Sequence, residues 1–184
     1  MQEELEASWQ DARQDLAGLA QSYRRYGTKL LKIASRDARP AEMASLLNLA
    51  READPRAELT VLEQSALAGN APLFDWMLQQ RMKPTPKDLH NYWIRLYAVT
   101  GGVDIWKALL AYNDEVISWE IGEHGDALGQ AVMKRDTALV RFLLEEGIDV
   151  KESNFVGTPV VETARAVNAG AEIVEMLKSY GAPE

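Results

Sequence analysis

Pairs of neighbouring apolar residues recur along the chain at a nearly constant interval. The pairs begin 32, 34 and 34 residues apart, and they are Leu73–Phe74, Ile105–Trp106, Leu139–Val140 and Ile173–Val174. A period between 20 and 50 residues is typical of an array of similar small units. The pattern therefore predicts a chain built of repeated elements, each burying its apolar face against its neighbours.

Each repeated unit has the pattern of two short helices joined by a polar turn. The clearest example is Asp126–Gly147, in which Leu128, Ala131 and Val132 fall at positions i, i+3 and i+4. The same helical spacing returns after a polar break, at Leu139, Val140, Leu143 and Leu144. This spacing predicts amphipathic helices. Helices this short are marginal in isolation, so the unit needs packed neighbours.

Four segments match one known repeat pattern at corresponding positions. Thr60–Asn70 follows the first half of that pattern and Glu145–Val150 follows its end, while Thr158–Pro159 matches its start and Tyr180–Ala182 its close. In these features the unit resembles the ankyrin repeat. The resemblance covers residues 28–184 as about five units, the first of them degenerate. It implies an all-α fold, an ankyrin-repeat α-solenoid of helix–turn–helix repeats with short β-hairpin loops.

The units depart from the family pattern at several positions, among them that of a histidine. The family histidine is replaced, in successive units, by Glu63, Arg95, Gly129 and Val161. The hydrogen bonds that this histidine makes between units must therefore be missing or rebuilt. Asp126 stands where the family has threonine, and aspartate can also cap the start of a helix.

Residues 2–26 carry an apolar stripe of a different kind. Its members alternate at spacings of four and three residues, and they are Leu5, Trp9, Ala12, Leu16, Leu19, Tyr23 and Tyr26. This heptad spacing predicts one continuous amphipathic helix. We expect residues 1–27 to form an N-terminal capping helix on the array of residues 28–184, since open ends of such arrays need covering. The alternative is self-association through residues 2–26.

Composition and charge narrow the possible partners. The 184 residues include 47% hydrophobic residues, no cysteine, and a formal net charge of −8. This charge argues against a general nucleic-acid binder, and no apolar run approaches the roughly 20 residues that a membrane span needs. The absence of cysteine excludes disulfides, and the acidic N-terminus does not resemble a signal peptide. We expect a cytoplasmic or nuclear protein without a membrane partner.

Candidate catalytic and metal-binding groups are few. His90 and His124 lie about one repeat apart, and a metal site there would need Glu120 or Glu123 as a further ligand. Glu120, Glu123 and Asp126 also form an acidic cluster, but open loops offer no dry pocket in which acid–base chemistry could be tuned. We therefore predict no catalytic residue, no metal and no cofactor.

Features that favour protein binding are more numerous. Residues 114–152 contain ten acidic and four basic residues, a balance that either attracts a basic partner or belongs to ordinary solvated faces. The connection from Val116 to Asp126 spans 10 positions, against 8 from Pro84 to Tyr92 and from Val150 to Thr158. We therefore expect it to project and to expose Trp119 and Ile121. Trp119 and Phe155 lie in consecutive predicted hairpins, where exposed aromatic side chains are typical interface anchors. The alternative is that they pack each hairpin against the next.

The resemblance also implies a binding surface, because partners of such proteins usually sit on the concave face. The positions carried over by the pattern are Asp88, Leu89, Thr100, Glu123, Met133, Lys134, Asn154, Phe155 and Asn168. The function expected is a protein–protein interaction module. Two alternatives stay open: an acidic inhibitor, immunity or regulatory partner of a basic protein such as a nuclease or toxin, and a small enzyme or ligand-binding protein.

Overall fold

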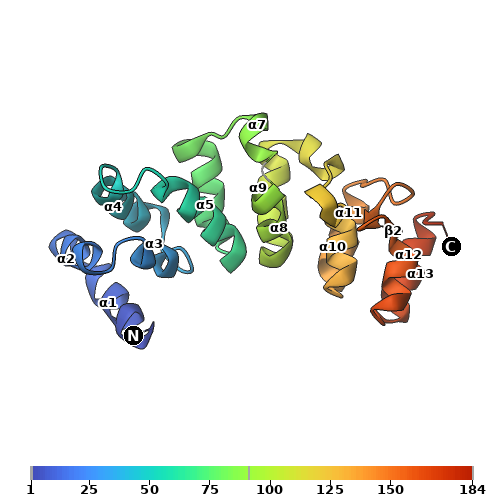
Figure 1. The fold of residues 1–184 in the computed structure, drawn as a ribbon, viewed down its shortest axis with the longest axis horizontal. Coiled ribbons are helices and arrows are strands. Elements are labelled where there is room, and N and C mark those ends of the chain that lie inside the picture. Colours follow the sequence, from blue (N-terminus) through green and yellow to red (C-terminus); the bar gives the residue numbers. More distant parts are fainter. Residues whose placement is uncertain (1, 91, 184) are drawn as a thin grey trace. The chain divides into compact units, whose positions relative to one another are not determined.

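The computed structural model describes residues 2–90 and 92–183, which are mostly helical, as predicted. These residues form thirteen α-helices, three further short helical segments and one pair of two-residue strands (Figure 1). The chain divides into two compact units, Met1–Lys83 and Pro84–Glu184. In the part of the chain that is described, no helix combines the length and apolar character needed to cross a membrane.

The first unit consists of three helical hairpins. Its elements are α1 (Gln2–Ala12), α2 (Leu16–Tyr26), α3 (Thr28–Ala34), α4 (Pro40–Ala50), α5 (Ala57–Ala68), α6 (Ala71–Trp76) and the π-helix η1 (Met77–Met82). Helix α3 packs against α1 and α5, while α4 packs against α2 and α6. The unit therefore has two layers, one of first helices and one of second helices.

The prediction of one continuous helix over residues 2–26 is wrong. Helix α1 ends at Ala12, and Asp15 caps a new helix by accepting hydrogen bonds from the N–H groups of Ala17 and Gly18. An aspartate side chain can accept hydrogen bonds from the backbone N–H groups of the residues that follow it, so aspartate favours the start of a helix over its interior. The resulting hairpin packs on α3 and α4, and Leu16, at the bend, is 61% exposed.

A small polar network fastens the N-terminal hairpin to the next one. Trp9 is buried, and its indole N–H donates to Asp37 at 2.8 Å. Arg13 forms ion pairs with Asp37 and with Glu42, each at 2.8 Å. Burial raises the pKa of Glu42, but hydrogen bonds from Arg13 and Arg39 outweigh that effect and hold its pKa at about 2. These contacts fit a hairpin that covers the neighbouring helices.

The second unit contains three further helical hairpins and their connections. Its elements are α7 (Pro86–Leu89), α8 (Tyr92–Gly101), α9 (Val103–Tyr112), the 3₁₀ helices η2 (Asp114–Ser118) and η3 (Gly122–His124), α10 (Ala127–Met133), α11 (Thr137–Glu145), β1 (Asn154–Phe155), β2 (Thr158–Pro159), α12 (Val160–Ala166) and α13 (Ala171–Ser179). Helix α10 packs between α8 and α12, and α11 packs between α9 and α13 (Figure 1). We call these two sets the first-helix layer and the second-helix layer.

The core of the second unit is built from the repeated apolar pairs. Ile105–Trp106 and Leu139–Val140 are fully buried, as is Ile173. These apolar residues therefore lie in the core, whereas Val174 is half-buried, and their period is the interval between successive helical hairpins. Lys134, at the C-terminal end of α10, donates a hydrogen bond to the hydroxyl of Thr100 on α8, 34 residues earlier.

Only one of the three connections predicted as β-hairpins in this unit is a hairpin among the described residues. There β1 and β2 pair antiparallel, with Asn154 opposite Pro159 and Phe155 opposite Thr158. The connection before α8 forms the short helix α7 instead, because Thr85 and Asp88 make a capping box around Pro86. The connection before α10 forms η2 and η3, with Asn113 capping η2.

Candidate functional site

The first-helix layer of the second unit presents aromatic side chains to solvent. Trp93 is 43% exposed and stacks on Tyr97, with ring centroids 5.9 Å apart. The two residues lie one turn apart on α8, while Ile94 and Ala98 on its other side are buried. Large aromatic rings held rigidly at a surface are typical anchors of protein interfaces. The sequence analysis missed both residues, although their i, i+4 spacing on α8 was a readable signal.

This surface continues onto the end of the next helix. The hydrogen bond from Lys134 to Thr100 joins the C-terminal ends of α10 and α8, and Met133 beside it is 43% exposed. Desolvation lowers the pKa of Lys134, with the charge of Asp136 acting in the opposite direction. Three of the predicted binding residues, Thr100, Met133 and Lys134, are thus exposed and brought together.

Asn168 lies at the corresponding end of α12, one period beyond Lys134. It is exposed and has a φ of 51°, a left-handed conformation that asparagine tolerates better than most residues. Arg135 has the same conformation in the preceding turn, with a φ of 59°. Asn168 therefore ends its helix as Arg135 does, and it adds a polar edge to the first-helix layer.

The longer connection between α9 and α10 is folded back onto the unit. Trp119 stacks on His90 with ring centroids 4.0 Å apart. Arg95, which is 2% exposed, donates to the backbone carbonyl of Glu120 at 2.5 Å and to that of His90 at 3.2 Å. Burial lowers the pKa of Arg95. The buried arginine therefore ties this connection to α8 with its own hydrogen bonds.

Two predicted binding residues are excluded by burial. Leu89 and Ile121 are both 0% exposed, so neither can contact a partner from the surface. The expectation of a projecting segment was wrong because the hydrogen bonds of Arg95 hold this connection against α8 and turn Ile121 inward. Trp119 is only half-buried, but one of its faces is occupied by His90.

The β-hairpin is fastened directly to the start of α10. Asp126 caps this helix through the N–H of Gly129 at 2.8 Å, and its other carboxylate oxygen accepts from the N–H of Asn154 at 3.3 Å. The N–H of Asp126 donates in return to the carbonyl of Asn154. Burial raises the pKa of the Asp126 carboxyl, although hydrogen bonds from Gly129 and Ser153 oppose this.

The close approach of this hairpin explains the glycines at positions 125 and 129. A Cβ added to Gly129 would lie 1.9 Å from the carbonyl oxygen of Asn154, and one added to Gly125 would lie 2.1 Å from it. Only glycine leaves room for the hairpin backbone at these two places. Direct backbone contact therefore holds the β-hairpin against the start of α10.

The remaining predicted residues are spread over the connections. Asp88 is exposed, and hydrogen bonds from the side chain and the backbone of Thr85 lower its pKa, so it serves as a helix cap. Glu123 is exposed, while Asn154 and Phe155 are half-buried in β1. The most exposed apolar residue of this hairpin is Val156, at 58%, which the sequence analysis did not single out.

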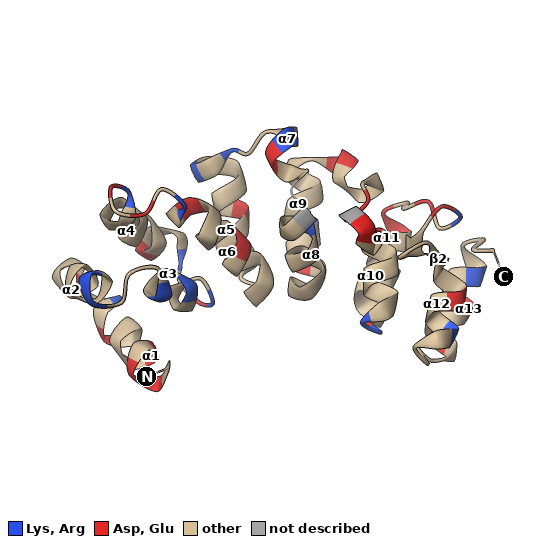
Figure 2. Ribbon diagram, in the orientation of Figure 1, with Lys and Arg blue, Asp and Glu red and all other residues tan. Residues whose placement is uncertain are grey.

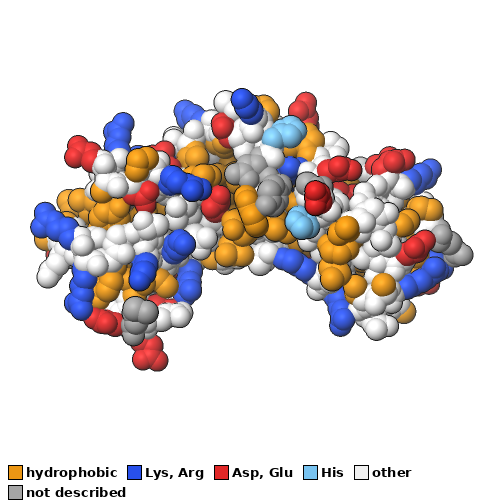
Figure 3. Space-filling model, viewed as in Figure 1, with side chains coloured by type: hydrophobic (Ala, Val, Ile, Leu, Met, Phe, Trp, Pro, Cys, Tyr) orange, Lys and Arg blue, Asp and Glu red, His pale blue; other side chains and the backbone are white. Residues whose placement is uncertain are grey.

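Both histidines are exposed side chains of the second unit. Figure 3 shows them in pale blue on one face, with acidic side chains in red on the same face. His90 is stacked on Trp119, and its Nδ1 lies 3.1 Å from the carbonyl oxygen of Pro86. Among the residues that the structure describes, no three potential metal-ligating side chains come together. Asp126 is committed to its capping role.

The two units differ in charge. The first has eleven Lys and Arg residues against twelve Asp and Glu, whereas the second has nine against sixteen. Figure 2 shows several of these acidic positions along the connections of the second unit, around η2 and ahead of β1. The second unit therefore carries nearly the whole net charge of the chain.

Comparisons with known proteins give no further guide to this surface. No model of a known protein family matches the chain. A search of curated proteins also finds no significant match.

Proposed function

We propose that this chain is a protein–protein interaction module made of ankyrin-type helical hairpins, and that its second unit carries the binding surface. The proposed surface consists of the exposed side chains of α8 and of the C-terminal end of α10. The two-layer packing and the 34-residue contact between Thr100 and Lys134 support the ankyrin-type description. Neither feature depends on the identity of the partner.

The observation that carries this proposal is the stacked aromatic pair on α8, in which Trp93 is exposed and Tyr97 is half-buried. Trp93 and Tyr97 support each other by stacking, so that little side-chain freedom remains to be lost on binding. Met133 extends the apolar area, and Lys134 supplies a charged edge. Apolar anchors with a polar rim are the usual composition of protein interfaces.

The mechanism is docking onto a preformed surface. The backbone beneath it is held by the fully buried residues of α8, α10 and their partners in the second-helix layer. Rigid surfaces lose little conformational entropy on association, so ordering the surface subtracts little from the free energy of binding. A buried Trp at the centre of such an interface typically contributes 2 kcal/mol or more, roughly, to binding.

The test is a quantitative affinity capture with the full chain from lysate of its own cells. The matched baits are the wild type, the double variant Trp93→Ala/Met133→Ala, and the control Tyr180→Ala, whose side chain is 47% exposed at the end of α13. We expect a specific binder to be retained by the wild type and the control and lost from the double variant. A set of captured proteins that is the same for all three baits would contradict the proposal.

A second candidate, an acidic regulatory partner of a basic protein, is favoured by the charge of the second unit. It predicts that the captured protein is basic and that its binding weakens steeply as the salt concentration rises. A neutral or acidic partner would count against it.

A further inference from the structure

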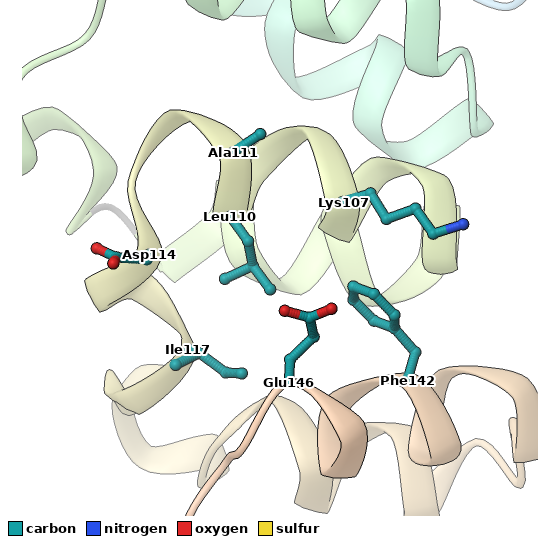
Figure 4. A pocket seen from close by; sticks show the side chains of 7 residues that line it. All are labelled: Lys107, Leu110, Ala111, Asp114, Ile117, Phe142 and Glu146. Atoms are coloured by element: carbon teal, nitrogen blue, oxygen red, sulfur yellow. The ribbon is translucent and has the colours of Figure 1, made fainter.

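A hollow opens between α9 and α11, on the second-helix layer of the second unit (Figure 4). It has a volume of about 330 Å³ and is walled by Leu110, Ile117 and Phe142, all of them half-buried. Figure 4 shows the carboxylate of Glu146 turned toward Leu110 and Phe142. We call this the α9–α11 hollow, and it combines an apolar wall with an acidic rim.

The rim carboxylates are unpaired. Glu146 and Asp114 are exposed, and within the described residues neither forms an ion pair. Lys107 also lines the hollow, but it pairs with Asp104 at 3.4 Å and extends away from Glu146. In the first unit, by contrast, five acidic side chains are paired with arginines.

The position of Glu146 makes its negative charge unfavourable for the protein alone. Glu146 directly follows the last residue of α11, where the helix dipole already places partial negative charge. Glu145 adds a second carboxylate at the same helix end. A cation bound in the α9–α11 hollow would relieve both interactions, so this end of α11 is suited to a positively charged group.

A neighbouring cleft continues this surface. It has a volume of about 490 Å³, it shares Ile117 with the α9–α11 hollow, and its rim carries Glu120, Asp149 and Glu152. These three acidic residues are exposed, and none forms an ion pair within the described part of the chain. Two adjoining depressions, each with carboxylates on its edge, therefore lie along η2.

We propose that this surface binds a basic segment of a partner protein, with an arginine side chain seated in the α9–α11 hollow. The methylene stem of arginine packs on Leu110 and Phe142, and its guanidinium pairs with Glu146. A second basic residue of the same segment then faces the carboxylates of the neighbouring cleft. The flat guanidinium also suits the face of an aromatic ring, which is available at Phe142.

This inference goes beyond the proposed function because it uses the other helix layer. The aromatic surface of α8 and α10 lies on the first-helix layer, and it shares no residue with the α9–α11 hollow. A partner could therefore use both surfaces, or two partners could bind at once. The charge of the rim also repels nucleic acids and other polyanions, which leaves a basic polypeptide as the fitting occupant.

The test measures binding of a fluorescently labelled peptide of alternating arginine and leucine to the full chain by fluorescence anisotropy. The control peptide carries citrulline, which has the shape of arginine without its charge. The variants are Glu146→Gln and Phe142→Ala, with Glu175→Gln on α13 as an exposed control of equal charge change.

We expect the arginine peptide to bind, the citrulline peptide to bind at least about tenfold more weakly, and Glu146→Gln to weaken binding by about tenfold. Phe142→Ala should weaken it as well, whereas Glu175→Gln and Trp93→Ala should leave it unchanged. Failure of the arginine peptide to bind would overturn the inference, as would equal binding of both peptides or an equal loss in Glu175→Gln. Because Trp93→Ala tests the first-helix layer alone, its outcome separates this inference from the proposed function.

Discussion

Gly129 on α10 and Asn154 in β1 approach so closely that no side chain fits between them. A Cβ on Gly129 would lie 1.9 Å from the carbonyl oxygen of Asn154 and 2.5 Å from its carbonyl carbon. These neighbours are backbone atoms, which cannot turn aside as a flexible side chain can. The contact fixes the β-hairpin on the start of α10.

Gly129→Ala should therefore destabilise the protein strongly. We expect a loss of about 3 kcal/mol, as for overpacking against a rigid neighbour, measured by chemical denaturation. The matched control is Gly147→Ala, where φ is 87° and nothing lies within 4 Å of an added Cβ. That substitution should lower the free energy of unfolding by only about 1 kcal/mol, the penalty of an alanine in the left-handed backbone conformation. Equal losses in the two variants would show that the hairpin can move away from α10.

Arg135→Gly should stabilise the protein. Arg135 holds a φ of 59° at the turn between α10 and α11, a conformation that costs a residue with a Cβ about 1 kcal/mol. Glycine removes that cost, so thermal unfolding should show a gain of up to about 1 kcal/mol. Arg135→Ala is the matched control, since it removes the same charge but keeps the Cβ. A gain in Arg135→Ala as large as that in Arg135→Gly would attribute the effect to charge.

Glu42 should make the stability of the first unit depend on pH. Its pKa is lowered from 4.5 to about 2, because Arg13 and Arg39 bind its charged form. A lowered pKa in the folded state gives stability that is present above pH 4.5 and lost as the pH falls toward 2. We expect Glu42→Gln to cost up to about 3 kcal/mol at pH 7, with the difference from wild type shrinking across that window.

The measurement for Glu42 is urea denaturation at a series of pH values. Glu52→Gln, at an exposed position, is the control, and it should stay close to wild type at neutral pH. A difference between wild type and Glu42→Gln that is the same at pH 7 and pH 2 would contradict the assignment.

Arg95→Ala should loosen the connection between α9 and α10. It removes hydrogen bonds to the carbonyls of His90 and Glu120 and leaves a gap beside Trp119. We expect a loss of about 2–3 kcal/mol and faster hydrogen exchange in residues 113–126. Arg165→Ala, on the exposed side of α12, should change stability by less than about 0.5 kcal/mol. Unchanged exchange in Arg95→Ala would mean that the connection is held by its other contacts.

The helical hairpins and their core could be predicted because they depend on local periodicity. The pair Leu139–Val140 and its equivalents are apolar at helical spacing, and they repeat at the distance that brings Thr100 next to Lys134. The bend at Asp15 was harder to predict, because a heptad stripe shows which face of a helix is apolar and does not show whether the helix is continuous. The capping preference of aspartate was the only local sign of that break.

The connections could not be predicted, since their shape depends on contacts from distant residues. Ile121 is buried because Arg95, 26 positions earlier, holds the backbone next to it. Leu89 is buried as the last residue of α7, whose capping box was present in the sequence but was interpreted as part of a hairpin. Among the candidate binding residues, those at helix ends, such as Met133 and Lys134, were placed on the surface correctly.

The capping carboxylate of Asp126 also sets a lower limit on the size of a folded fragment. Asp126 starts α10, yet its partner Asn154 belongs to the hairpin that leads into α12. A chain cut after Gly147 would keep both helices of that pair, but it would strip one side of α10 and leave the carboxylate without the Asn154 amide. The stability of the pair α10 and α11 is therefore linked to that of α12 and α13. We expect a truncation that removes α12 and α13 to unfold the start of α10.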